Sequence, residues 1–450
     1  MKKQKTYKYT ILTFGCQMNK NDSERLSSIL ENMGLKSTDD LESTDVILLN
    51  SCSVRESAEA RIFGKVSNFK KLRKKNPSLI IGVTGCMPGR DKDGKIEKRM
   101  EGIDLFFSTK DMVRLPSLLS ELNPDFREME DVEKDYLNLR PNYQKNYQAF
   151  VTISAGCNQF CTFCVVPYSR GLHTNRPVMD ILEEAKNLVS NGCKEIALLG
   201  QIVNNYKAPD KENFSKENPY KKNDFAKLLW EINQIDGLQR LDWPAPHPMY
   251  FDDELLDAIT LPKQVNYVHL PVQSGNNEIL EKMNRRHTRD YYINLVKDIR
   301  KKRPDIAIST DIIVGFCGET EEQFEDTVSL YKECDFDIAY PAKYSNRSGT
   351  LAAKIYKDDI SQEEKKRRWF VLQDLMKETT YRKNKKYLDK KLSVLVDEFK
   401  NGWCVGNSNE MKRVSFKGDK ALVGTIQDVE IFKTDTWMMW GSCQQSKQIK

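Results

Sequence analysis

The chain has 450 residues, of which 30% are charged and 39% hydrophobic, a composition typical of a globular protein with two or three domains. No apolar run approaches the roughly 20 residues that cross a bilayer, and the stretch after the basic residues 1–5 is too short for a signal peptide. This excludes a membrane-spanning protein, and we expect a cytoplasmic location without membrane contact. The net charge of +6 is mild and indicates nucleic acid only where basic residues cluster. Eleven cysteines, an odd number, favour metal ligands over disulfides.

Strands and helices alternate at the beginning of the chain. Apolar patterns predict strands over residues 7–14, 46–49 and 79–83, and helices over residues 22–33 and 56–75. The second of these strands is a continuous apolar run, which is typical of a parallel sheet covered on both faces. We therefore expect an α/β domain here.

A cysteine follows each of these three strands within a few residues. We call Cys16, Cys52 and Cys86 the N-terminal triad. Adjacent parallel strands lie roughly 4.8 Å apart and ligands bind outside their carboxyl ends, so the three thiols can converge on one metal cluster. The alternative is that each cysteine is a small buried residue that closes its strand. Residues 121–148, which follow this region, are polar and acidic without periodicity and predict a linker.

Six strand–helix repeats begin at residue 149. The predicted strands are 149–154, 194–199, 238–243, 264–270, 307–314 and 336–344, with helices between them at, for example, 178–190, 225–235, 253–259, 291–301 and 321–333. Six such units indicate a parallel sheet curved into a partial (β/α)6 barrel. The polar segment 206–223 predicts a surface insertion.

Three cysteines in the spacing C-x3-C-x2-C follow the first strand of this barrel. We call Cys157, Cys161 and Cys164 the loop triad. Three thiolates leave one iron of a [4Fe–4S] cluster without a protein ligand, and an open iron is a chemical site. The loop also lies at the carboxyl end of a strand, where such barrels hold their chemistry. The alternatives are a three-cysteine zinc site with a distant fourth ligand, or unrelated buried thiols.

Three polar stretches lie at or after the carboxyl ends of later strands, at residues 199–206, 269–275 and 344–350. Their side chains can meet a cofactor or substrate, although ordinary loop capping explains each one equally well.

The sequence pattern changes near residue 383, after the strand–helix repeats. A basic run at 382–386 comes first. Short alternating strands are then predicted over residues 392–397, 413–416 and 429–432. This pattern indicates a small β-barrel. Basic residues together with Trp403, Phe416 and Trp437 can form an RNA surface, whereas in the alternative these aromatic side chains fill the barrel core.

The loop triad resembles the cluster motif of the radical S-adenosylmethionine enzymes, in which the open iron binds the methionine part of the cofactor. Phe163 is then expected beside the adenine of that cofactor. Nearly the whole chain resembles the methylthiotransferases: Thr-Phe-Gly-Cys-Gln-Met-Asn, Asn-Ser-Cys-Ser-Val-Arg-Glu and Gly-Val-Thr-Gly-Cys around the N-terminal triad match their first domain. The tail resembles their RNA-binding TRAM barrel. The resemblance implies domains at residues 6–122, 143–376 and 383–446.

Within this family, residues 13–19 and 164–171 resemble the branch that modifies prenylated adenosine in tRNA. The resemblance implies transfer of a methylthio group to carbon 2 of N6-dimethylallyladenosine beside the anticodon, with S-adenosylmethionine and two [4Fe–4S] clusters. The loop triad is expected to hold the cluster that cleaves the cofactor, and the N-terminal triad the cluster that holds the sulfur. No side-chain base can usefully deprotonate the carbon 2 position, so cofactor chemistry is needed and no catalytic residue is assigned beyond the clusters.

Other activities stay open as alternatives. They are methylthiolation of threonylcarbamoyladenosine in tRNA or of a ribosomal-protein aspartate, and a zinc-stabilised RNA-binding protein without enzymatic activity. The implied partners are the anticodon loop of tRNA, an electron donor such as flavodoxin or ferredoxin, and a sulfur donor, and we expect a monomer.

Several positions depart from the family pattern. Cys317 stands where proline is usual and His287 where tyrosine is usual, and the segments 243–246 and 402–416 also differ. These departures leave the RNA contacts open but do not touch the two triads. Four further cysteines are expected to be structural: Cys193, Cys334, Cys404 and Cys443.

Overall fold

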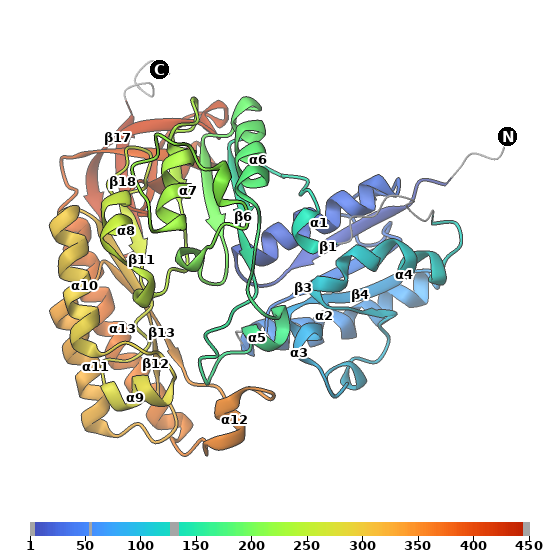
Figure 1. Ribbon diagram of the computed structural model, residues 1–450. Coiled ribbons are helices and arrows are strands. Elements are labelled where there is room, and N and C mark those ends of the chain that lie inside the picture. The colour runs from blue at the N-terminus through green and yellow to red at the C-terminus, as the bar shows by residue number, and fades with distance from the viewer. Residues whose placement is uncertain (1–4, 54–55, 127–134, 444–450) are drawn as a thin grey trace.

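A computed structural model of the protein describes residues 5–53, 56–126 and 135–443. The chain forms an N-terminal α/β layer, a central curved sheet with helices on its outer face, and a small β-barrel near the C-terminus (Figure 1). None of the helices in these residues is long and apolar enough to cross a membrane.

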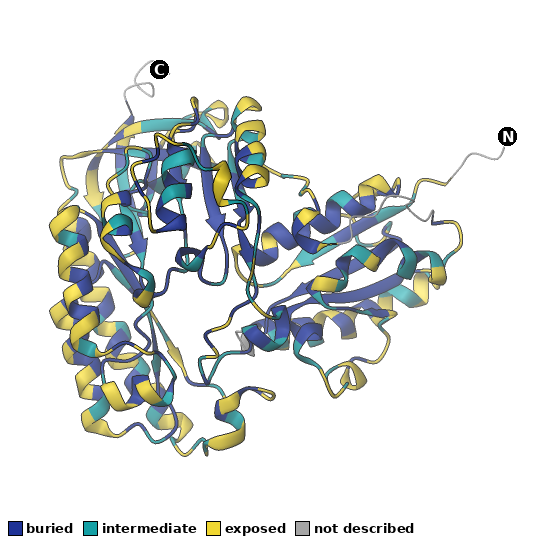
Figure 2. Ribbon diagram, in the orientation of Figure 1, coloured by how far each residue is buried: buried dark blue, intermediate teal, exposed yellow. Residues whose placement is uncertain are grey.

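The N-terminal sheet is parallel and has the strand order β2-β1-β3-β4-β5. Its strands are β1 (Lys8–Thr13), β2 (Lys36–Ser37), β3 (Val46–Ser51), β4 (Ile80–Gly85) and β5 (Leu105–Phe106). Every residue of β3 and β4 is buried, because helices cover both faces, as the apolar run predicts (Figure 2). The helices are α1 (Gln17–Asn32), α2 (Glu56–Lys75), α3 (Cys86–Arg90) and α4 (Leu115–Leu122).

Helix α1 begins five residues before the predicted start at residue 22. Cys16 and Asn19 form a capping box at its first turn, which satisfies backbone amides there. The first turns also bury the polar side chains of Asn21, Asp22 and Arg25, so an apolar pattern could not indicate them.

The predicted linker is only partly a linker. Residues 127–134 lie outside the described residues, but Phe126, Tyr136, Leu137 and Leu139 are buried in the core of the N-terminal layer. These are single apolar residues without a period, so only the folded partners could indicate their burial.

The central domain contains the six predicted strands in chain order. They are β6 (Gln148–Thr152), β9 (Glu195–Leu199), β10 (Arg240–Asp242), β11 (Tyr267–His269), β12 (Ala307–Val314) and β13 (Ile338–Lys343). They pair as two parallel three-stranded sheets, and a parallel bridge between Leu241 and Gln264 joins the two. The predicted partial barrel is therefore confirmed.

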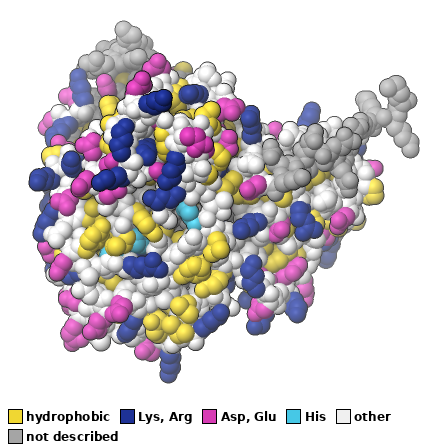
Figure 3. Space-filling view, viewed as in Figure 1, with side chains coloured by type: hydrophobic (Ala, Val, Ile, Leu, Met, Phe, Trp, Pro, Cys, Tyr) yellow, Lys and Arg dark blue, Asp and Glu magenta, His cyan; other side chains and the backbone are white. Residues whose placement is uncertain are grey.

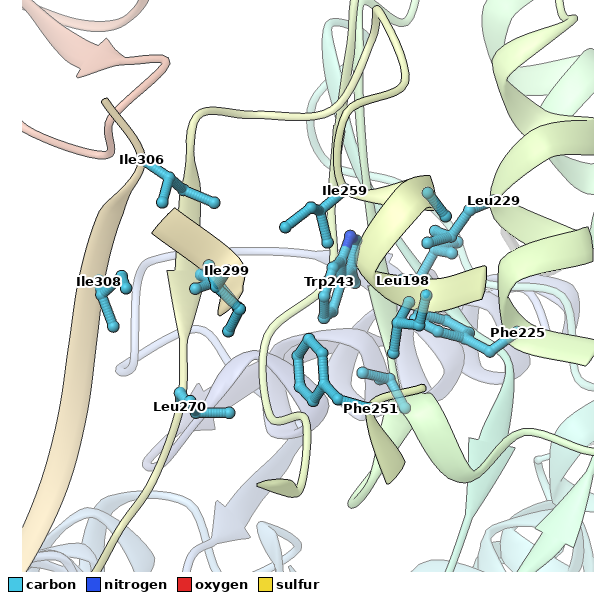
Figure 4. Close-up of a cluster of buried hydrophobic side chains, with 14 of the residues drawn as sticks. Leu198, Phe225, Leu229, Trp243, Phe251, Ile259, Leu270, Ile299, Ile306 and Ile308 are labelled. Carbon is cyan, nitrogen blue, oxygen red and sulfur yellow. The ribbon is translucent and has the colours of Figure 1, made fainter. Parts of the chain in front are cut away.

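Helices cover the outer face of this sheet (Figure 1). They are α6 (Val178–Ser190), α7 (Asp224–Asn233), α8 (Asp253–Ala258), α9 (Asn277–Lys282), α10 (Arg289–Lys302) and α11 (Glu321–Cys334). Phe225 and Trp243 pack edge to face between helices and strands, with ring centroids 5.4 Å apart (Figure 4). The Trp243 indole donates a 2.6 Å hydrogen bond to Gln264, so its polar edge is satisfied inside the core.

The predicted surface insertion at residues 206–223 is anchored at both ends. Tyr206, Ala208 and Tyr220 are buried in the barrel core, and the Tyr206 hydroxyl donates to the carbonyl of Arg176. Only the polar middle of the segment is mainly at the surface, so the prediction is wrong for the ends.

A long helix, α13 (Gln362–Lys385), links the central domain to the C-terminal barrel. The sequence patterns did not indicate it, since half of its residues are charged. Buried ion pairs explain part of this composition: Arg368 bonds Glu319 at 2.8 Å and Lys365 pairs with Asp358.

The C-terminal barrel is closed and has the strand order β14-β15-β16-β18-β17. Its strands are β14 (Lys391–Lys400), β15 (Trp403–Ser408), β16 (Arg413–Lys417), β17 (Ile426–Thr434) and β18 (Met439–Cys443). It packs where the strands of the central sheet begin: Arg240 of β10 donates to the carbonyls of Asn407 and Ser408 at 2.9 and 2.8 Å.

Candidate active site

The N-terminal triad lies at the carboxyl ends of the neighbouring strands β1, β3 and β4, as its spacing predicts. Cys52 and Cys86 are buried and Cys16 is exposed. A side chain at Gly15 would come within 2.9 Å of the Cys52 Cβ atom, so glycine lets the first cysteine loop approach the second. Its φ of +145° also favours glycine.

The loop triad follows β6 in a tight loop. Gly156 opens this loop with φ +76°, and a Cβ there would clash with the carbonyl of Leu172 at 2.1 Å. The backbone amides of Gln159 and Val166 point to the sulfurs of Cys157 and Cys164, each at 3.5 Å. Amide hydrogen bonds of this kind stabilise sulfur in its thiolate form.

Burial raises the pKa of Cys164 to about 12, and Cys161 beside it raises this pKa further. Burial also raises the pKa values of Cys157 and Cys86. Buried thiols this close together do not ionise as a group unless a cation replaces their protons, and a metal deprotonates its thiol ligands outright. The donor set therefore fits an iron–sulfur cluster.

One arginine contacts each triad. Arg170 donates from Nε to the Cys86 sulfur at 3.3 Å, and Arg285 approaches the Cys161 sulfur at 3.7 Å. The Nε atom of Arg285 is buried without a hydrogen-bond partner. An unsatisfied buried donor beside three thiols fits an anionic group in this space. Across the described chain, no group of three or more His, Cys, Asp and Glu side chains is placed to hold a single metal ion.

Segments next to the two triads meet at one contact between the N-terminal layer and the central domain. Helix α3, which begins at Cys86, packs against α5 (Val166–Arg170), which begins two residues after Cys164. A Cβ on Gly89 would come within 2.1 Å of the Ser169 carbonyl, so the two backbones nearly touch. The structure thus brings together two cysteine sets that the sequence keeps 71 residues apart (86 to 157).

Two of the three predicted polar stretches contact this region directly. In the stretch 269–275, Pro271 accepts a 2.7 Å hydrogen bond from Arg285. In 344–350, the Ser348 carbonyl accepts from Arg90 of α3. The third stretch, 199–206, begins close to β7 (Ser154–Ala155), a short strand that pairs with β8 (Thr174–Asn175). A Cβ atom on Gly200 would lie only 2.4 Å from the Ser154 hydroxyl, so glycine allows this close approach.

Phe163 is half-buried and packs against a small apolar cluster between α9 and the segment after β12. This cluster includes Phe316, Tyr344 and the unusual Cys317. Cys317 is thus a core residue rather than a candidate ligand. Phe163 itself lies between Cys161 and Cys164 of the loop triad in the sequence.

Polar side chains line the inner face of the central sheet; the sequence indicated His269, in the stretch 269–275, but not Ser309 or Asp311. Val268, Ile308 and Ile312 point to the helices, so the alternating residues of β11 and β12 point inward. There His269 bonds both Ser309, at 2.7 Å, and Asp311, at 3.1 Å. The Asp311 side chain is 42% exposed in the middle of a sheet, so this face is open to a ligand.

The aromatic residues of the C-terminal barrel divide between its core and its surface. Phe416 is fully buried, Trp403 is half-buried and Trp437 is 54% exposed. Trp437, Arg413 and Tyr340 help to line a pocket of about 170 Å³ between this barrel and the central sheet. The alternative that these aromatic side chains fill the barrel core is therefore confirmed for Phe416, whereas an RNA surface at Trp437 stays a prediction. Cys193, Cys334, Cys404 and Cys443 lie in hydrophobic cores, as expected.

The sequence did not indicate the roles of Arg170, Arg285 and Asp22. Arg170 lies six residues after Cys164 on the same loop, which is the one signal that could have drawn attention to it. Asp22 likewise lies six residues after Cys16, whereas Arg285 is remote from any cysteine in the sequence. Only the folded chain brings Arg170 to Asp22 and Arg285 to Cys161.

Comparison with known families and proteins now adds to this geometry. Residues 8–108 match "Uncharacterized protein family UPF0004" and residues 151–331 match the "Radical SAM superfamily". A solved radical S-adenosylmethionine methyltransferase, TsrM from Kitasatospora setae, superposes with a TM-score of 0.53 over 75% of this chain and 73% of that one. At 14% identity, this likeness concerns the fold alone.

Curated relatives match almost end to end. A protein of Alkaliphilus oremlandii is 41% identical over 97% of this chain and 93% of its own length. Proteins of Thermoanaerobacter pseudethanolicus and Clostridium tetani are 41% and 40% identical, over 98% and 96% of this chain and 93% and 95% of their own lengths. All three are named tRNA-2-methylthio-N(6)-dimethylallyladenosine synthase. The chain therefore belongs to the tRNA-2-methylthio-N(6)-dimethylallyladenosine synthase family.

Proposed function

We propose that the protein transfers a methylthio group to carbon 2 of N6-dimethylallyladenosine beside the anticodon of tRNA. The observation that carries this proposal is the meeting of two three-cysteine sets from different domains at the α3–α5 contact. A structural metal site needs one complete ligand set, whereas two sets of three each leave one position open to a cofactor or substrate. Family membership points in the same direction.

The two triads take different roles in this proposal. The loop triad holds one [4Fe–4S] cluster with S-adenosylmethionine, and the N-terminal triad holds the second. When bound, these groups supply reductive cleavage of the cofactor and the sulfur that is inserted. The chain buries Cys52, Cys86 and Cys157 and directs the amides of residues 159 and 166 at the sulfurs of Cys157 and Cys164. In this proposal a cofactor adenine packs on the half-buried ring of Phe163.

The inner face of the central sheet holds the base. Histidine, carboxylate and hydroxyl groups at His269, Asp311 and Tyr340 can read the polar edge of an adenine there. The unpaired loop of an anticodon stem can present a base to this face at lower cost than a duplex, where the base must first be unpaired.

The first test is the prenyl requirement. The group adds five carbons, and burying them at roughly 0.8 kcal/mol per carbon contributes a few kcal/mol. We therefore expect kcat/KM on unprenylated tRNA to fall by about one to two orders of magnitude or more, because 1.4 kcal/mol is about tenfold. The measurement compares matched tRNAs with and without the group, by mass spectrometry of nucleosides, and includes a threonylcarbamoyladenosine tRNA. Equal turnover without the prenyl group, or preference for the threonylcarbamoyl substrate, would refute the assignment.

The second test concerns the C-terminal barrel, which we propose binds the tRNA. Exposed aromatic rings stack on unpaired bases, which contributes roughly 1–3 kcal/mol per base, so Trp437→Ala should weaken tRNA binding by about fivefold to a hundredfold. Phe370→Ala is the matched control, because that ring is 46% exposed on α13 instead. Equal affinities of the two variants would make Trp437 a purely structural residue.

Removal of the whole barrel is a less specific version of this test. Truncation near residue 383 should also weaken binding, but it exposes Arg240, whose guanidinium the barrel carbonyls cover.

Lys and Arg side chains are spread over the face shown in Figure 3, among acidic ones. Affinity of the intact protein should therefore fall as salt rises, through counterion release.

We further propose that the domains are residues 6–122, 143–376 and 383–446. Helix α13 crosses the boundary between the last two, so limited proteolysis should cut there slowly. The electron donor, such as flavodoxin or ferredoxin, the sulfur donor and the monomeric state belong to the same proposal. Size-exclusion chromatography with light scattering tests the last point.

A further inference from the structure

Arg170 occupies the contact between the two triads and is almost fully buried, with 4% of its side chain exposed. It belongs to α5, on the same loop as Cys164, but its contacts lie in the N-terminal layer. The guanidinium therefore joins the loop that carries one triad to the strand end that carries the other.

Two partners share this guanidinium. Its Nε atom donates to the Cys86 sulfur at 3.3 Å, and its Nη2 atom donates to Asp22 Oδ2 at 2.5 Å. Asp22 is fully buried and also accepts a hydrogen bond from the Tyr136 hydroxyl. A buried Tyr–Asp–Arg chain thus ends on the sulfur of a cysteine in the N-terminal triad.

Hydrogen bonds to ligand sulfurs and nearby charge set the electron affinity of an iron–sulfur site. A donor or cation at the sulfur stabilises the form with one more electron, and an anion disfavours it. These effects are large here because the groups are excluded from water. The second hydrogen-bond partner of Arg285 at the loop triad is different in charge. Arg285 donates to the neutral carbonyl of Pro271, whereas Arg170 donates to the carboxylate of Asp22.

We propose that Arg170 is a positioning residue that fixes the Cys86 sulfur and raises the reduction potential of the cluster at the N-terminal triad, and that Asp22 limits this rise. The inference rests on the proposed function, which places a cluster there. It predicts effects of opposite sign for the two partners of one ion pair. A purely structural ion pair would not produce opposite signs, because losing either partner would destabilise the same contact.

The experiment uses the full-length protein with Cys157, Cys161 and Cys164 replaced by alanine, so that only the N-terminal cluster is present. Its midpoint potential is measured by redox titration followed by electron paramagnetic resonance. R170M should make the potential more negative, so that the ratio of reduced to oxidised cluster at a fixed potential falls at least tenfold, or about 59 mV for one electron. D22N should shift the potential in the positive direction, and R170K should restore part of the loss.

R285M is the matched control, because it removes an arginine beside the other triad and should leave this potential unchanged. Thermal unfolding and iron content of each variant are measured alongside. If R170M does not fold, the midpoint potentials of D22N and R170K still show in which direction the ion pair shifts the potential of the cluster. Potentials that stay unchanged, or that shift in the same direction in R170M and D22N, would overturn the proposal for Arg170. An absence of any cluster in the parent protein would instead overturn the proposed function.

Discussion

Replacing Cys157, Cys161 and Cys164 by alanine is expected to abolish all cleavage of S-adenosylmethionine and to remove about half of roughly eight irons. The sulfurs of Cys157 and Cys164 accept hydrogen bonds from the backbone amides of residues 159 and 166, so this loop is arranged around its thiols. Without the thiolates, no electron reaches the cofactor, so the loss should be complete rather than partial. The measurements are iron content and release of 5′-deoxyadenosine under reducing, anaerobic conditions.

Cys193→Ala is the control for this variant. Cys193 is equally buried, at 2% exposure, but it lies in the apolar core of the central domain. The control should therefore retain its iron and its cofactor cleavage. Cleavage that persists in the triple variant would show that the radical site lies elsewhere. A protein that is colourless before any substitution would favour zinc, which has no visible absorption.

The triple replacement of Cys16, Cys52 and Cys86 by alanine is expected to leave cofactor cleavage in place while methylthiolated product falls to background. These cysteines lie at strand ends of a separate sheet, so the loop triad keeps its own ligands. Arg170 keeps its ion pair with Asp22 in this variant, so the contact between the domains should persist. The measurement follows 5′-deoxyadenosine and modified nucleoside in the same reaction.

The two readouts separate loss of sulfur insertion from loss of folding. An unfolded variant would lose both products, whereas the proposed role predicts loss of only one. Cys404→Ala, in the core of the C-terminal barrel, serves as the control and should form both. Methylthiolated product from the triple variant would exclude the N-terminal triad as the sulfur site.

The hydrophobic pattern of the sequence was sufficient to predict helices and strands wherever the buried residues are apolar. The run 46–49 and the helix 56–75 are found as β3 and α2, and each of the six central strands lies within a few residues of its prediction. Hydrophobic periodicity reports which face is buried, and in these elements the buried face is apolar. The cysteine spacing likewise predicted the strand-end positions of both triads, since parallel strands place their carboxyl ends at one edge.

The hydrophobic pattern did not predict the structure where polar residues are buried or where single apolar residues lie in polar segments. Helix α13 contains buried Lys365 and Arg368, and α1 begins with buried polar residues, so their periodicity is hidden. Tyr136 and Tyr206 lie in polar segments, and only their distant partners explain their burial.

The sequence by itself therefore determined the order of the six central strands, the two cysteine triads and the three-part architecture, because these follow from neighbours along the chain. The tertiary structure alone decided that α3 meets α5, that Arg170 reaches Cys86 and Asp22, and that Arg285 reaches Cys161. Such contacts depend on side-chain packing between segments that are far apart in the sequence. Residues that meet across more than 80 positions leave no periodic signal in the sequence.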